Sequence, residues 1–189
     1  MVTTALLVGF ALVAAATDVA RHRIYNWNTY PGIAAAAAVS LGGWAAIEWA
    51  GADAARLARL GWIEPSQCLL GLAACFGLML VCYVLFGVGG GDVKLIAMIG
   101  AFVGPEQGLE AMLWTFVIGG CLGLLVLVWR VGPWRLLLRA VRQVVWTLRL
   151  GGWAPLADHE RAELRQRLFL APCAVLAIVI VRFGLVEYL

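Results

Sequence analysis

Long apolar segments dominate this chain and limit what it can fold into. Six of them can be recognised, at about residues 3–17, 31–50, 66–88, 93–103, 108–129 and 168–186. A helix that crosses a bilayer needs about 20 mostly apolar residues, and it satisfies its backbone hydrogen bonds within itself. The composition agrees, because only 13% of the residues are charged, against about 25% in soluble domains. We therefore predict an all-α, polytopic membrane protein with about six transmembrane helices.

Two of the six segments are shorter than a membrane span. The first (3–17) reaches that length only if its helix continues past Asp18, and the fourth (93–103) is clearly too short. Partial helices occur at membrane depth where protein surrounds them. We expect the fourth segment either to extend into its neighbours or to be a partial helix supported by the bundle. Together the segments predict a single transmembrane domain over residues 1–189.

The distribution of basic residues predicts the orientation of these helices. Lys and Arg collect in the cytoplasmic loops of membrane proteins. If the N-terminus is outside, only Arg56, Arg59 and Arg182 also lie outside, and the other 11 of the 14 basic residues are cytoplasmic. The first and third segments then both run inward and end near Asp18 and Asp92. The chain thus predicts two carboxylates at the cytoplasmic edge of the membrane.

A further helix is predicted between the last two apolar segments. Four arginines in residues 134–150 follow helical spacing and share one stripe: Arg135, Arg139, Arg142 and Arg149. Apolar residues fill much of the remaining surface, which is typical of a basic amphipathic helix on the cytoplasmic membrane surface. It would lie in an insert of about residues 131–167 and serve as an interfacial anchor. A docking surface for a substrate is the alternative.

The cysteines and the net charge indicate neither a metal site nor a nucleic-acid partner. All five cysteines lie inside apolar segments, and none forms a Cys-x-x-Cys pair. Buried free cysteine behaves as a small apolar residue, so packing is its expected role. The net charge of +3 is small, and topology explains the arginines. We expect no metal, no cofactor and no nucleic acid, and a lipid bilayer around the chain.

Paired carboxylates have a specific chemistry that Asp18 and Asp92 would share. Two carboxyl groups held close together carry one proton, because two like charges at short range do not both ionise easily. The ionised group can draw a proton from water while the protonated group donates a hydrogen bond to a scissile carbonyl. Aspartates at a membrane edge also serve ion-coupled transport. The two residues alone therefore leave both hypotheses open.

Two short blocks around these aspartates resemble the motifs of the type IV prepilin peptidases. The first is Thr17-Asp18, followed by basic residues, an isoleucine and an asparagine, which are Arg21, Arg23, Ile24 and Asn26. The second is Gly89-Gly90-Gly91-Asp92-Val93-Lys94, which matches the GxGD block of that family with its following lysine. GxGD alone is a weak indication. Both blocks in this order, at the same predicted membrane face, are a strong one.

The resemblance implies a membrane aspartic endopeptidase with Asp18 and Asp92 as its catalytic pair. Gly89 and Gly91 would let the loop bend and approach the substrate backbone, and Lys94 would orient Asp92 or anchor the helix at lipid headgroups. The implied substrate is a prepilin. Such a protein has a short basic leader, a cleavage site at the cytoplasmic face and then an apolar helix.

Two departures from the family pattern indicate which members this chain is similar to. Tyr25 stands where the family usually has proline. No domain with paired cysteines precedes the core, whereas the long bacterial members carry one and also methylate the new pilin N-terminus. We therefore expect no methyltransferase activity and a short form similar to those serving tight-adherence (Flp-type) pili. Archaeal preflagellin peptidases are a related alternative. The resemblance implies an inner-membrane location and pilus assembly or secretion machinery as a further partner.

Two other functions remain open at this point. Presenilin-like intramembrane proteases share GxGD but carry a Pro-Ala-Leu block near a late helix, and the order here is Leu170-Ala171-Pro172. The second alternative is not an enzyme: a small ion-coupled transporter or assembly factor that uses the aspartates for coupling.

Overall fold

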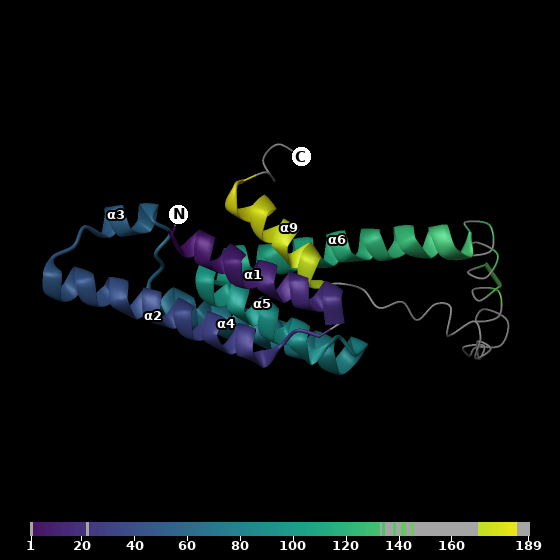
Figure 1. Cartoon of the computed structure of the whole chain (residues 1–189), viewed down its shortest axis with the longest axis horizontal. Coiled ribbons are helices and arrows are strands. Elements are labelled where there is room, and N and C mark those ends of the chain that lie inside the picture. Colours follow the sequence, from purple (N-terminus) through teal and green to yellow (C-terminus); the bar gives the residue numbers. More distant parts are fainter. Residues whose placement is uncertain are drawn as a thin grey trace. The chain divides into compact units, whose positions relative to one another are not determined.

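The chain is built from helices. The computed structural model describes residues 2–21, 23–132, 134, 138, 141, 142, 145 and 170–184, and no strand occurs among them. The helices (Figure 1) are α1 (Val2–Arg21), α2 (Asn26–Ala50), α3 (Ala54–Arg59), α4 (Pro65–Phe86), α5 (Gly90–Val103), α6 (Pro105–Val131) and α9 (Leu170–Arg182). The predicted all-α fold class is confirmed.

Four helices are long and apolar enough to cross a membrane: α1, α2, α4 and residues 105–129 of α6. Helix α1 runs through Asp18 to Arg21, which gives the first segment the length that its apolar residues alone lack. The prediction of a polytopic membrane protein is confirmed, whereas the count of six and the outside N-terminus stay predictions. In the last segment the helix ends earlier than expected. Helix α9 ends at Arg182, and Gly184 follows in the left-handed region with φ of 63°, a conformation typical of helix ends.

The chain divides into two compact units. One consists of Met1–Ile118 with Phe169–Leu189, and the other of Gly119–Leu168. The predicted amphipathic helix and its insert, about residues 131–167, fall in the second unit and lie almost entirely outside the described residues. The single-domain prediction over residues 1–189 therefore stays a prediction. Both aspartates belong to the first unit.

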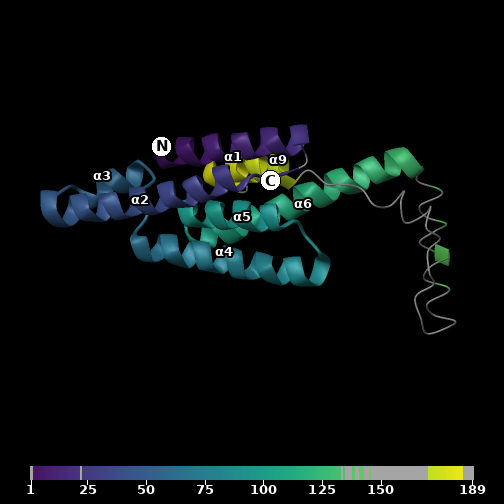
Figure 2. The same ribbon diagram turned by 60° about the horizontal axis from the view of Figure 1, so that its bottom comes forward.

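The short helix α5 is the centre of the first unit. It contacts α1, α2, α4 and α9, and all its residues from Leu95 to Phe102 are buried. Figure 2 shows α5 between α2 and α4. Its 14 residues span about 21 Å, less than the roughly 30 Å hydrocarbon core of a bilayer. Helix α5 is therefore a partial helix supported by the bundle, which was one of the two expectations for the fourth segment.

Small residues let α4 and α5 approach closely. Gly71 on α4 faces Gly100 on α5, and a Cβ added to either one would overlap the backbone of the other. Cys75 is fully buried and lies against both Gly100 and Gly108. In lipid, where no hydrophobic force joins helices, such close packing holds them together. Cys75 thus has the packing role that the sequence predicts for the cysteines.

Polar contacts close the end of the first unit where α1 begins. The Thr3 hydroxyl donates to the Gly61 carbonyl at 2.9 Å, and the Ser40 hydroxyl donates to the Ile63 carbonyl at 2.9 Å. The Trp62 indole donates to the Ser40 carbonyl, also at 2.9 Å. These bonds fix the connection between α3 and α4. Asp18 lies 15 positions further along α1, about 22 Å away, so the aspartates lie at the opposite end.

Candidate active site

Asp18 is buried near the end of α1, with 9% of its surface exposed. Its carboxylate oxygen Oδ2 accepts a hydrogen bond from the backbone N–H of Ala171 at 3.3 Å. Ala171 lies in the first turn of α9, where unpaired N–H groups and the helix dipole favour negative charge. Helix α9 therefore supplies a partner for a carboxylate 153 positions earlier in the chain.

Asp92 is half-buried in the first turn of α5 and interacts electrostatically with Asp18. It precedes the apolar segment 93–103 and lies outside the four helices that could cross a membrane. Burial of the carboxyl group, and then the negative charge of Asp18, raise the pKa of Asp92 from its ordinary value of 3.8 to about 7, while a backbone hydrogen bond at Gly89 partly opposes this. The structure thus brings the two predicted carboxylates together.

The glycines before Asp92 leave space for neighbouring atoms at this site and do not form a turn. A Cβ added to Gly89 would lie 2.8 Å from Oδ2 of Asp92. A Cβ added to Gly91 would lie 2.9 Å from Cβ of Ile24, so the second aspartate block packs directly on the segment that follows the first. None of the three glycines at 89–91 has a positive φ, whereas Gly87 ends α4 with φ of 66°. The residue that needs glycine's conformational freedom here is Gly87.

Lys94 extends toward α2. Its Nζ donates to Oδ1 of Asn26 at 2.7 Å and lies 4.9 Å from the centre of the Tyr30 ring. Asn26 is the first residue of α2. The ammonium group therefore connects the first turns of α5 and α2.

Tyr25, the residue in place of proline, has an extended backbone with φ of −88° and ψ of 140°. This is close to the conformation that proline itself adopts. The tyrosine hydroxyl accepts a hydrogen bond from Arg21 Nη1 at 3.3 Å. The residue before α2 is thus extended without being a proline, and the Arg21 side chain of α1 reaches it.

The contribution of α9 is the part of the site that sequence reasoning missed. Pro172 in its first turn was the available indication of a helix start, because proline is favoured where its missing N–H is not needed. Nothing local in the sequence indicates that the N–H of Ala171 meets Asp18.

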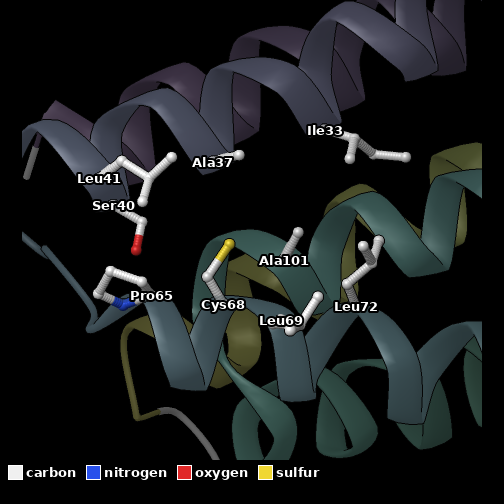
Figure 3. A pocket seen from close by; sticks show the side chains of 9 residues that line it. All are labelled: Ile33, Ala37, Ser40, Leu41, Pro65, Cys68, Leu69, Leu72 and Ala101. Atoms are coloured by element: carbon white, nitrogen blue, oxygen red, sulfur yellow. The ribbon is translucent and has the colours of Figure 1, made fainter.

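An apolar pocket of about 260 Å³ lies between α2 and α4, away from the carboxylates (Figure 3). Its wall includes Ile33, Leu41 and Leu72, and Ala101 of α5 lies at its base. Ala101 is nine positions after Asp92, about 13 Å along the helix. The pocket carries no carboxylate and so has no part in the chemistry of the pair. Among the described residues, no group of three or more His, Cys, Asp or Glu side chains could hold a metal ion.

Fold and site together define a polytopic helical membrane protein with two interacting carboxylates at one end of its bundle. Residues 5–124 match the model of the type IV leader peptidase family, and because this is well over half of the chain, the protein belongs to that family. It is a type IV leader peptidase-like protease, a multi-pass inner-membrane protein with prepilins as its substrate class. Comparisons with curated proteins and with solved structures each gave no match. The matched range contains both aspartates and ends before α9.

Proposed function

We propose that this chain is an aspartic endopeptidase that removes the basic leader of Flp-type prepilins at the cytoplasmic face of the inner membrane. The observation that carries the proposal is the electrostatic interaction of Asp18 with Asp92. The two residues come from separate blocks of the sequence and lie on two helices that contact each other, α1 and α5. An archaeal preflagellin-like substrate is the related alternative.

The proposed mechanism uses one proton shared by the two carboxyl groups. The N–H of Ala171 at the start of α9 favours the negative charge on Asp18, and beside that charge Asp92 keeps the shared proton. Asp18 removes a proton from a water molecule, whose oxygen attacks the scissile carbonyl while Asp92 donates its proton to the carbonyl oxygen. Collapse of the tetrahedral intermediate returns one proton to the pair and delivers one to the leaving amine.

The cytoplasmic location of the cut is supported by the basic residues. In the predicted topology 11 of the 14 Lys and Arg are cytoplasmic, and by the positive-inside rule the aspartates would then lie at the cytoplasmic face. A prepilin helix lying beside the bundle in the bilayer would present its leader junction at this depth. Binding of the long helix could then position a bond at its end.

The test is leader removal in a defined membrane. We expect the purified full chain, in lipid vesicles with a prepilin, to cut once between the basic leader and the apolar helix, with or without a chelator; mass spectrometry locates the cut. A cut inside the apolar helix would favour the presenilin-like alternative. An intact prepilin together with ion flux through the vesicles would favour the transporter.

Leader removal should decline as the pH rises through about 7. Asp92 must keep its proton to act as the acid, and burial beside Asp18 raises the pKa of Asp92 to about 7. Above about pH 8, kcat/KM should fall roughly tenfold per pH unit, and at low pH it should fall again when the pair gains a second proton. The measurement is kcat/KM against pH. An optimum near about pH 3, as for soluble aspartic proteases, without activity at neutral pH, would contradict the mechanism.

A further inference from the structure

We propose that Lys94, Asn26 and Tyr30 form a clamp, called here the Lys94 clamp, that holds the first turn of α5 on the start of α2 and thereby fixes the separation of the two aspartates. Lys94 is then a positioning residue. The expected effect of the clamp on cleavage rests on the proposed function, whereas its expected effect on stability rests on the geometry alone.

The contacts of the clamp are strong for their position at the surface. The bond from Nζ of Lys94 to Oδ1 of Asn26 is 2.7 Å long, in the short range of hydrogen bonds with an ionised donor. The same ammonium group lies over the Tyr30 ring at 4.9 Å, within the range of cation–π attraction. Asn26 and Tyr30 are one helical turn apart on α2, so one cation engages a single face of that helix.

The clamp acts beside both aspartates. On α5, Gly91 precedes Asp92 and packs on Ile24, and Lys94 follows Asp92 by two positions and binds Asn26. The described residues 23–25 lie between the end of α1 and Asn26, so α5 is fixed to this connection on either side of Asp92. Asp18 lies within the last turn of α1, just before the same connection. A shift of α5 relative to residues 23–26 would therefore change the distance between the two carboxylates.

The clamp works through position rather than through its charge. The groups that change the pKa of Asp92 are its burial, the Asp18 carboxylate and the backbone at Gly89. The ammonium group of Lys94 contacts Asn26 and Tyr30 of α2 instead. Loss of the clamp should lower the rate and leave the alkaline limb of the pH profile in place.

The experiment compares Lys94→Met, Asn26→Ala and the double variant in the full chain. We expect kcat to fall about 10- to 100-fold in each, as for a small misplacement of reacting groups, with KM within about twofold and an unchanged alkaline midpoint. The double variant should be no slower than Lys94→Met, because Lys94→Met already breaks the contact that Asn26→Ala removes. Lys94→Arg should recover part of the rate, and Arg56→Met on α3 is the matched control for loss of a cation.

Thermal unfolding of the same variants tests the contact without cleavage. Asn26 and Tyr30 are exposed, so the variants should fold, and the shift of Tm in the double variant should be smaller than the sum of the single shifts. Additive shifts, full activity of Lys94→Met, or a moved alkaline midpoint would each overturn the clamp. A wild-type chain that cuts no prepilin would overturn the proposed function instead, and the Tm cycle would still decide whether the contact exists.

Discussion

Leader removal is expected to fall at least about 1,000-fold when either Asp18 or Asp92 is replaced by asparagine. The amide keeps the shape of the carboxyl group but can neither take a proton from water nor give one to a carbonyl. Asp18→Asn removes the proposed base beside the start of α9, and Asp92→Asn removes the proposed acid in the first turn of α5. The measurement is the rate of leader removal by the full chain in lipid vesicles.

The double variant should be no slower than either single variant, because two groups that share one proton act as a unit. The matched control is Asp53→Asn. Asp53 accepts the N–H of Ala55 at 2.9 Å as the N-cap of α3, and asparagine serves equally well at that position. Near-normal cleavage by Asp18→Asn or by Asp92→Asn would rule out the two-aspartate mechanism.

The sequence predicted the helices well where they are apolar and less well where they are polar. Helix α2 begins at Asn26, five positions before the expected start at Pro31. Its first turns contain Asn28 and Thr29, which lower the hydropathy although both are buried. Asn28 donates to the Phe10 carbonyl of α1 at 2.9 Å. Hydropathy does not register that a buried polar side chain such as Asn28 is satisfied inside the bundle, so the predicted boundary falls too late.

For the site, the sequence predicted which groups meet but not what holds them. The distribution of basic residues placed Asp18 and Asp92 at one membrane face, and their interaction in the structure agrees with this. The hydrogen bond from Ala171 and the one between Lys94 and Asn26 were not predicted. Both join residues 68 or more positions apart, and no helical or strand period carries information over such a distance.

Gly89→Ala and Gly91→Ala should each reduce leader removal by about 100-fold or more, the cost of a displaced reacting group. A methyl group at Gly89 would lie 2.8 Å from the Asp92 carboxylate and push it from its place. At Gly91 it would lie 2.9 Å from Cβ of Ile24, and because that atom is next to the backbone, α5 and residues 23–25 must move apart. The first change displaces one carboxylate, and the second changes the spacing of the pair.

Gly90→Ala is the matched control within the same block. An added Cβ there meets only Cε2 of Tyr83 at 3.8 Å, an ordinary contact, and alanine favours the helix by about 0.5–1 kcal/mol over glycine. We expect wild-type cleavage and a slightly higher Tm. If all three alanine variants lose activity equally, the block requires chain flexibility rather than space. If none of the three variants loses activity, glycine is not needed at positions 89 and 91 to avoid contact with Asp92 and Ile24. Only loss at these two positions with retention at 90 agrees with close packing around the aspartate pair.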